Sequence, residues 1–403
     1  TIAANGQVTF TQTLIGTALD ISGDIDVDGT TNLDVVDIDG AVDMASTLQV
    51  DGAITGSSTI NGVGISSNIS NFSQGILISQ DAGTGTLSTA SNNTGLGFEV
   101  FDDLTSGDGN TGVGMQSLTK LTTGQYNTAL GKGSLNTNTT GASNTAIGID
   151  ALYALTTASN NTAVGSDALK ANTTGAANTA IGHQALDSNT EASSNVAVGK
   201  DALGANTLSS QNVAIGRSSL AALNHTTATN GYNVAVGPDA GAAMTTGIQN
   251  TIIGGLAGDA LTDADYNVAV GVNSLSANTK GGANTAIGTS AMANFNVTTS
   301  TNTFNTAVGA DAGTALTTGT QNTLIGGQAG DAITTASNNT AVGYAALTAN
   351  TTGADNVAMG VNSLDANTTG NYNVSIGTAA LTSNTTASNN VAVGQGALAA
   401  NTT

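Results

Sequence analysis

Cysteine and tryptophan are absent from this sequence, and proline occurs once in 403 residues. Without cysteine the chain forms no disulfide bridge, no thiolate zinc site and no thiol nucleophile. Charged residues are also scarce, at 8% compared with about 25% in ordinary soluble domains. Neutral Asn, Thr, Ser and Gly must therefore form most of the surface, which is unusual for an enzyme and typical of a fibre or a repeat protein.

Basic residues are the rarest charged group, because six Lys and Arg stand against 27 Asp and Glu, a formal net charge of -21. Such a chain repels the phosphates of nucleic acids and anionic lipid headgroups. No apolar run approaches the roughly 20 residues that span a bilayer. We therefore expect neither nucleic acid binding nor membrane insertion. The first residue is Thr1, and the last repeat is incomplete, so we expect a processed chain or a segment of a longer one.

What the sequence does contain is a repeat. The motif Asn-[Thr/Val]-Ala-[Val/Ile]-Gly begins 18 times with small variations, and its 17-residue period is interrupted by only two longer, 21-residue intervals. The Asn residues that open the units are Asn93, Asn110, Asn127, Asn144, Asn161, Asn178, Asn195, Asn212, Asn233, Asn250, Asn267, Asn284, Asn305, Asn322, Asn339, Asn356, Asn373 and Asn390. A second, longer period relates the stretch from Asn233 to the stretch from Asn305, so segment duplication built the array.

Each unit, numbered from its Asn, begins with residues that favour a β-strand. Position 2 is Thr or Val, position 3 is usually Ala, position 4 is always Val, Ile, Leu or Met, and position 5 is always Gly. Position 9 is usually Leu, but where it is Gly, position 12 is large and apolar, as in the pairs Gly241 with Met244 and Gly258 with Leu261. This exchange indicates a packed interior of fixed volume.

A unit of this length is too short for a helical hairpin or a propeller blade, and its Thr, Asn and Gly content disfavours helix. One turn of a parallel β-solenoid fits, so we predict an all-β solenoid of about 18 turns over residues 93–403, roughly 85 Å long. Stacked turns place like residues over like, which predicts a ladder of side-chain amides at position 1 and a φ above zero or a tight contact at position 5. These structural positions are represented by Asn93, Asn127, Asn161, Asn195, Gly97, Gly131, Gly165 and Gly199.

The two faces of each predicted strand differ, because positions 2 and 4 share one face and position 3 takes the other. If Ala at position 3 lines the interior, the position-4 residues form an exposed stripe of 18 aliphatic side chains. On a monomer such a stripe is a large adhesive patch, and a symmetric oligomer covers it. We expect the oligomer; the alternative places Val and Ile inside a self-sufficient monomeric solenoid.

Tandem units such as NTAVGSDALKANTTGAANTAIGHQAL (161–186) resemble the head repeats of YadA-like trimeric autotransporter adhesins, and similar arrays occur in bacteriophage tail fibres. The resemblance covers about residues 93–403. It implies a left-handed parallel β-roll with three chains side by side, which serves adhesion or host recognition outside the cell, on a virion or a cell surface. The unit here is longer than the usual head repeat, and no heptad stalk, membrane anchor or fibre-chaperone domain is evident, which favours a phage fibre.

Residues 1–62 carry a different, Asp-rich repeat in which alternating aliphatic residues lead into tight turns. The turns are Asp28-Gly29, Asp39-Gly40, Asp51-Gly52 and Asn61-Gly62. This pattern predicts a shaft-like segment of short strands, as hairpins or as intertwined chains. Residues 63–92 are expected to form a connector with one strand near Ile76 to Ser79.

Asp24, Asp26 and Asp28 alternate like the opening of an EF-hand loop, whose carboxylates bind Ca²⁺. The match ends there, because Val35 stands where the bidentate Glu is needed and no helix is expected on either side. A strand with Asp outward is the simpler interpretation, and Ca²⁺ binding of another kind is the alternative. We expect no other cofactor.

No residue pattern predicts catalysis. His183 and His225 are the only histidines, and His183 occupies a variable position without fixed partners, which indicates a solvent-facing role. Nucleophile elbows and P-loops are absent, and the Asp residues at position 7 are single rather than paired, unlike the carboxylates of a polysaccharide-degrading enzyme. We therefore predict that the protein is not an enzyme.

The two longer intervals hold insertions at 224–231 and 296–303. Because the units on both sides keep the regular period, we expect the extra residues to bulge outward. The candidate receptor contacts are Asn224, His225, Tyr232, Asn296 and Phe304. Five of the 12 aromatic residues directly precede an opening Asn, and rings at this position either bind sugars or pack in the core or a subunit seam.

Together these patterns predict a trimeric structural rod, a phage tail fibre or related virion fibre, that attaches to a host glycan or protein through multivalency. Its other partners would be structural proteins of the virion or cell surface. A cell-surface trimeric adhesin is the alternative, and an ice-binding solenoid with stacked Thr is a further one.

Overall fold

The computed structural model describes residues 59–60, 63–69, 72–79 and 87–402. The chain divides into two compact units, Thr1–Gly56 and Ser57–Thr403. The first unit lies outside the described residues, and so do the cation-binding candidates Asp24, Asp26 and Asp28.

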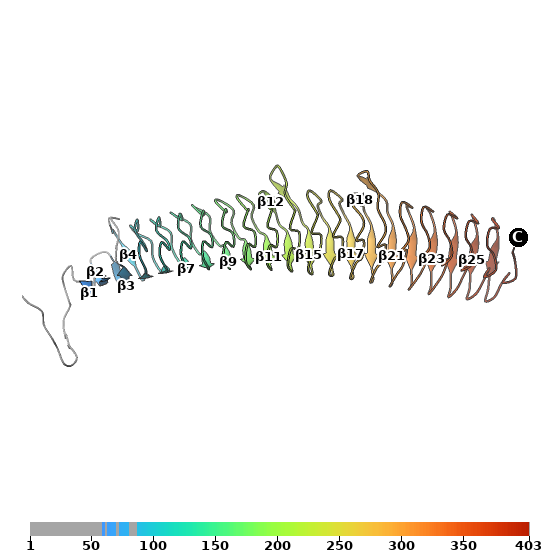
Figure 1. The fold of residues 1–403 in the computed structure, drawn as a ribbon, viewed down its shortest axis with the longest axis horizontal. Coiled ribbons are helices and arrows are strands. Elements are labelled where there is room, and N and C mark those ends of the chain that lie inside the picture. Colours follow the sequence, from blue (N-terminus) through green and yellow to red (C-terminus); the bar gives the residue numbers. More distant parts are fainter. Residues whose placement is uncertain (1–58, 61–62, 70–71, 80–86, 403) are drawn as a thin grey trace, which may run out of the picture. The chain divides into compact units, whose positions relative to one another are not determined.

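From Thr94 onward the second unit is a parallel β-solenoid, and each of its 18 turns contributes one three-residue strand at positions 2 to 4 of the repeat (Figure 1). These strands are β5 (Thr94–Leu96), β6 (Thr111–Val113), β7 (Thr128–Leu130), β8 (Thr145–Ile147), β9 (Thr162–Val164), β10 (Thr179–Ile181), β11 (Val196–Val198), β13 (Val213–Ile215), β15 (Val234–Val236), β16 (Thr251–Ile253), β17 (Val268–Val270), β19 (Thr285–Ile287), β21 (Thr306–Val308), β22 (Thr323–Ile325), β23 (Thr340–Val342), β24 (Val357–Met359), β25 (Val374–Ile376) and β26 (Val391–Val393). Neighbouring turns pair in register, so that Ala146 lies opposite Ala163. The predicted all-β solenoid with one repeat per turn is confirmed, and the described residues contain no helix.

The first strands of the unit lead into the stack. β1 (Thr59–Ile60) pairs antiparallel with β2 (Val63–Ile69), which pairs antiparallel with β3 (Phe72–Ser79). β3 then pairs in parallel with β4 (Ala90–Ser91) and with β5, where Ile76 lies opposite Thr94. The prediction of one strand in residues 63–92 is therefore wrong, because β2, β3 and β4 all lie there; the strand expected near Ile76 to Ser79 is the end of the longer β3, which pairs with the first strand of the array.

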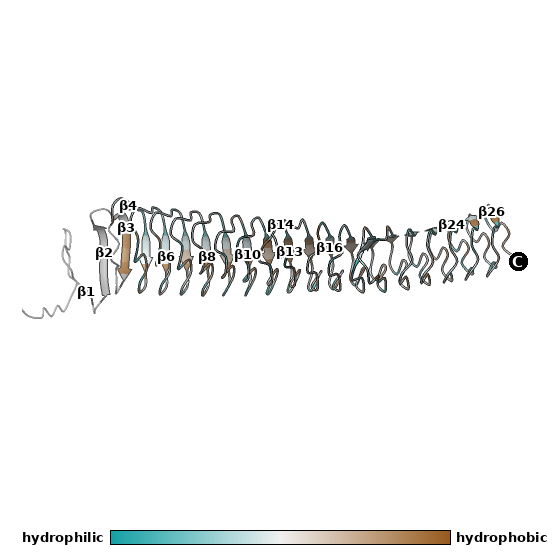
Figure 2. Cartoon of the chain, turned by 90° about the horizontal axis from the view of Figure 1, so that it is seen from above, coloured by the Kyte–Doolittle hydropathy of each residue, from teal (hydrophilic) through white to brown (hydrophobic). Residues whose placement is uncertain are grey.

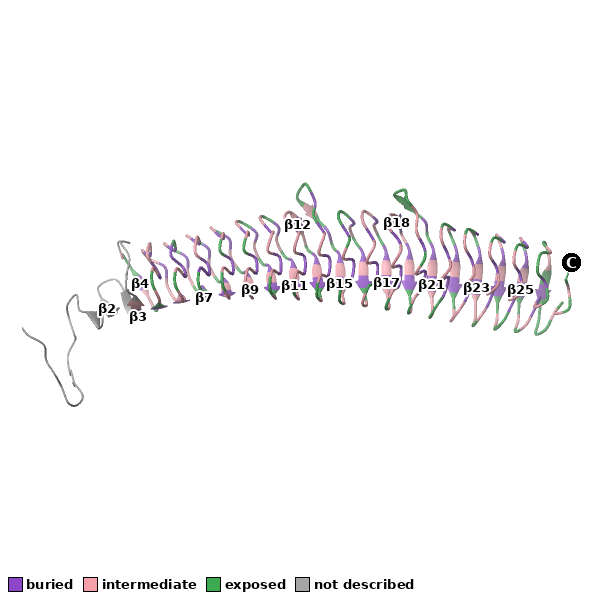
Figure 3. Cartoon of the chain, viewed as in Figure 1, coloured by how far each residue is buried: buried purple, intermediate pink, exposed green. Residues whose placement is uncertain are grey.

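The interior is lined by position 3 of the strands and by positions 9 and 12 (Figure 3). Ala163 and Leu169 of one turn are wholly buried, and their counterparts along the stack are buried as well, except Leu398 of the last turn, which is 50% exposed. The expected exchange between positions 9 and 12 has a direct steric cause, because a Cβ on Gly258 would lie 2.6 Å from Leu261 Cδ1. Ile252, which replaces the usual Ala at position 3, helps to fill the same space.

Buried Asn side chains form two kinds of ladder, of which the one at position 1 runs through the stack and the one at position 12 joins only short groups of turns. At position 1, Asn178 Nδ2 donates to Asn161 Oδ1 at 3.3 Å and to the Ala192 carbonyl oxygen at 2.9 Å. This is the predicted ladder. A second ladder at position 12 was not predicted: Asn172 Oδ1 accepts from the Gly175 N–H in its own turn and from Asn189 Nδ2 in the next.

The position-4 side chains point away from the interior, on the face opposite to the buried Ala residues. Ile181, Ile215 and Ile253 are 41%, 39% and 38% exposed, and the corresponding residues of the other turns are partly or largely exposed as well. The strands of successive turns follow one another along one side of the array. Figure 2 colours parts of these strands as hydrophobic. The placement of Ala inside and Val or Ile outside, which the oligomer hypothesis requires, is the one observed.

Four positions of each turn adopt a positive φ. In one turn these are Gly165 (φ 137°), Asp167 (φ 59°), Leu169 (φ 52°) and Ala177 (φ 56°), at positions 5, 7, 9 and 17. A positive φ is uncommon for Leu. The buried position of the Leu169 side chain, rather than local preference, holds this conformation.

Candidate functional site

The two insertions extend outward from the stack, as predicted, at 224–231 and 296–303 (Figure 1). The turns on either side keep their register, because Val213 pairs with Val234 and Thr285 pairs with Thr306 across them. Each insertion forms a two-stranded parallel sheet with the turn before it. These sheets join β12 (Ser209–Ser210) to β14 (Thr229–Asn230), and β18 (Gly281–Gly282) to β20 (Thr301–Asn302).

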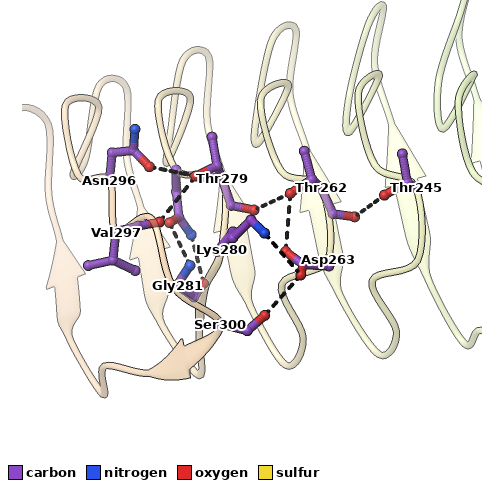
Figure 4. A network of polar contacts seen from close by, with 10 residues as sticks. Thr245, Thr262, Asp263, Thr279, Lys280, Gly281, Asn296, Val297 and Ser300 are labelled. Carbon is purple, nitrogen blue, oxygen red and sulfur yellow. Dashed lines mark hydrogen bonds and ion pairs between the residues drawn. The ribbon is translucent and has the colours of Figure 1, made fainter.

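A ladder of Thr hydroxyls at position 13 fixes the base of each insertion (Figure 4). Thr245 Oγ1 donates to the Thr262 carbonyl oxygen at 3.1 Å, and Thr262 Oγ1 donates to that of Thr279 at 3.0 Å. At the next turn Thr279 Oγ1 donates to Asn296 Oδ1 at 2.7 Å. Asn224 accepts from Thr207 in the same way at the first insertion. Both Asn residues therefore anchor the insertions, and the outward bulge begins after them.

The candidate receptor contacts differ in accessibility. Tyr232 and Phe304 are 52% and 58% exposed, Asn224 is exposed and Asn296 is half-buried. His225, in contrast, is buried, with Nε2 3.0 Å from the Thr246 carbonyl oxygen. His225 is therefore not on the surface of the first insertion, and its burial does not suit the role of a receptor contact.

A polar hollow of about 290 Å³ lies beside the second insertion, and no motif in the sequence indicates it. It is lined by Asp263, Ala264, Asp265, Tyr266, Lys280, Gly282, Ser300, Thr301 and Asn302. Three separate segments supply these residues: the end of one turn, the β18 region of the next, and the insertion itself. Stacking brings them together, and we call this feature the second-insertion hollow.

In the second-insertion hollow, the Asp263 carboxylate contacts both a hydroxyl and an ammonium group (Figure 4). Its Oδ2 atom accepts a hydrogen bond from Ser300 Oγ at 3.0 Å and lies 3.6 Å from Lys280 Nζ. Burial raises the pKa of the Asp263 carboxyl, but hydrogen bonds from Ser300 and Thr262 and the positive charge of Lys280 outweigh it and hold the pKa below its ordinary value. Asp263 is therefore a charged acceptor at neutral pH.

A second group of carboxyls lies at position 10 of the repeat. Asp259, Asp331 and Asp365 each have Oδ1 buried without a hydrogen-bond partner. Burial raises the pKa of all three carboxyls, and the negative charges of Asp239 and Asp311 add to the increase for Asp259 and Asp331, respectively. In the charged form these carboxylates destabilise the folded array.

Replacing all three with Asn is expected to raise the melting temperature at pH 7. The folded-state pKa of each lies above the unfolded value near 3.9, so the wild type gains stability as the pH falls from neutrality through the raised values toward that value. The triple variant should lose the part of this gain that the three carboxyls supply and keep the part supplied by Asp187, whose pKa burial also raises, as thermal melts between pH 7 and pH 4 would measure. Glu191→Gln, which neutralises an exposed carboxylate, is the control. A wild-type pH profile retained by the triple variant would contradict the assignment.

Within the described residues, no cluster of three or more His, Cys, Asp or Glu side chains is arranged to hold a metal ion. The same part of the chain has no helix of the length and apolarity that crosses a membrane. Comparison of the chain with protein-family models, with curated proteins and with solved structures found no match.

Proposed function

We propose that this chain is a structural fibre protein, most simply a phage tail fibre, that assembles as a homotrimer and attaches its particle to a host surface. One observation carries the proposal: an aliphatic stripe at position 4 follows the whole stack while the interior is filled by Ala and Leu. Monomeric soluble proteins rarely expose a continuous apolar surface of this kind. Three chains packed stripe to stripe, as a left-handed β-roll of the kind that the resemblance implies, remove it from water.

The rest of the geometry suits a stiff rod that presents binding loops at a distance and catalyses no reaction. Each turn is tied to the next by backbone pairing and by Asn and Thr ladders, which makes the stack stiff. Three copies of each insertion per fibre, and several fibres per particle, turn weak contacts into strong attachment. The ice-binding alternative receives less support, because position 2 of the strands holds Thr in some turns and Val in others, which interrupts a regular array of stacked Thr.

The oligomeric state tests this proposal. We expect sedimentation equilibrium of the full chain to give the mass of three chains at micromolar concentration. The triple variant Ile181→Asp, Ile215→Asp and Ile253→Asp should sediment as a monomer with its β-type circular dichroism retained. Charges on the stripe would be desolvated in the trimer but remain hydrated in the monomer.

A matched control adds the same three charges elsewhere. Thr174, Thr318 and Thr352 are exposed at position 14, outside the strands. Their replacement by Asp is expected to leave the trimer intact. A wild-type chain that is folded and monomeric would refute the trimer, and dissociation of the control variant would show that net charge rather than the stripe controls assembly.

A further inference from the structure

We propose that the second-insertion hollow binds one sugar unit of a neutral saccharide, an inference that rests on the proposed role in host attachment. The hollow combines carboxylates, an ammonium group, a hydroxyl and an amide with an aromatic ring. Sugar hydroxyls both donate and accept hydrogen bonds, so a mixed set of donors and acceptors suits them. The volume of about 290 Å³ is near the lower end of the range for small-molecule sites, which suits a single ring.

The charges favour a neutral ligand. Asp263 and Asp265 outnumber Lys280, whose ammonium group is already paired with Asp263. The chain as a whole is strongly acidic, so a sialylated or phosphorylated glycan would be repelled. Carboxylates instead accept strong hydrogen bonds from uncharged hydroxyl donors.

Tyr266 and Gly282 contribute the remaining two features of the site, an aromatic ring and a position without a side chain. Tyr266 lines the hollow with 49% of its surface exposed, so its ring offers an apolar face to the C–H groups of a sugar and its hydroxyl offers a polar edge. Gly282 keeps the hollow open, because a Cβ there would lie 2.6 Å from Asn302 Oδ1 and 3.0 Å from the Asp265 carbonyl oxygen.

The first insertion provides an internal comparison, because the two insertions occupy equivalent places in the duplicated segments and form the same two-stranded sheets. The residues that correspond to Asp263, Asp265, Tyr266, Lys280, Gly282 and Ser300 are Glu191, Ser193, Ser194, Leu208, Ser210 and Ala228. The first insertion therefore keeps the backbone arrangement without the second carboxylate, the ring or the ammonium group.

The fold of this turn does not require a carboxylate at position 265. Asp265 Oδ1 accepts the Ile248 N–H at 2.8 Å, and in the earlier copy Ser193 Oγ accepts the Ala176 N–H at 3.0 Å. A hydroxyl thus performs the structural role, and a carboxylate at 265 supplies an additional acceptor oxygen. Asp265→Ser with Tyr266→Ser is therefore a substitution that this fold already accommodates at the equivalent turn.

The test uses the full-length chain and immobilised neutral oligosaccharides built from glucose, galactose, mannose and N-acetylglucosamine, with sialylated oligosaccharides as the charged comparison. We expect binding of at least one neutral oligosaccharide at one site per chain. Asp265→Ser with Tyr266→Ser should weaken it by about tenfold or more, since it removes an acceptor for charge-assisted hydrogen bonds and a packing surface. The control, Ser194→Ala in the equivalent turn beside the first insertion, keeps the hydrogen bond between Ser193 and Ala176 and should bind as the wild type does.

A transplant provides the converse experiment. The six changes Glu191→Asp, Ser193→Asp, Ser194→Tyr, Leu208→Lys, Ser210→Gly and Ala228→Ser should raise the stoichiometry from one site to two per chain. Unchanged affinity in the Asp265 and Tyr266 variant, a preference for sialylated ligands, or no binding to any neutral oligosaccharide would overturn this inference. None of these results affects the trimer mass, so failure of the saccharide site is distinguishable from failure of the proposed fibre.

Discussion

Gly199→Ala is expected to destabilise the array by about 3 kcal/mol or more, although it adds a single methyl group. Gly199 has a φ of 134°, a region that residues with a Cβ rarely enter. The added Cβ would lie 2.5 Å from the carbonyl oxygen of Gly216 in the next turn. That oxygen belongs to the backbone of a paired turn, so it cannot rotate away as a side chain can. The strain therefore falls on the contact between two turns.

Chemical denaturation followed by circular dichroism would measure this effect. Because each turn contacts only its neighbours, we expect a weakened contact to divide the array and to produce two transitions in place of one. Gly204→Ala is the control in the same turn, since the nearest atom to its new Cβ is the Asp201 carbonyl oxygen at 3.4 Å. It should change the stability by no more than about 0.5 kcal/mol. Equal losses in the two variants would show that position 5 has no special steric role.

The sequence predicted those parts of the fold that follow from stacking identical units. A fixed period places each residue against its own counterpart, so an invariant Asn or Gly has the same environment in every turn, and its role is visible in the pattern. Alternation within the strand likewise placed Ala163 and Val164 on opposite faces, and the structure shows that Ala163 is the inner residue.

The conformations of the turns could not be predicted in this way. Position 7 has a positive φ whether it holds Asp167, Gln184 or Ser290, so no residue preference reveals it. At position 9 the local preference of Leu even opposes the observed φ. Tight bending of a short turn around a narrow core imposes the positive φ at positions 7 and 9. That constraint is a property of the closed turn rather than of any local segment.

The candidate site was predicted only in part. Register alone indicated that the insertions bulge outward, but it could not show that His225 is buried or that Asn296 anchors the loop. The second-insertion hollow joins residues between Asp263 and Asn302 that share no motif. Comparison of the two duplicated copies offered a signal, because Asp265 and Tyr266 replace two Ser residues in otherwise similar stretches.

Asn178→Ala should cost about 1–3 kcal/mol, because it leaves the buried Asn195 N–H without an acceptor, whereas the Ala192 carbonyl oxygen keeps the hydrogen bond from Asn189 Nδ2. The Asn178 side chain donates to the Ala192 carbonyl oxygen at 2.9 Å and accepts the Asn195 N–H at 3.0 Å. Both partners lie inside the stack, where water cannot replace the lost amide. Asn294→Ala is the control, since Asn294 is exposed on the same array. Denaturation midpoints of the two variants would measure the difference, and similar values would mean that the ladder contributes little to stability.

The Asn178→Asp variant separates the hydrogen bonds of the ladder from its packing. The new carboxylate has nearly the shape of the amide, but it presents an acceptor to Asn161 Oδ1 and to the Ala192 carbonyl oxygen, where the amide donates. At neutral pH it should therefore destabilise the array at least as much as Asn178→Ala. Burial and the two facing oxygens raise the pKa of such a carboxyl, so its protonated form can donate again. Stability should then recover as the pH falls through that raised value, whereas the Asn178→Ala variant has no group that could produce such a recovery. Parallel pH profiles of the two variants would contradict the assignment of the ladder as a chain of donated amide hydrogen bonds.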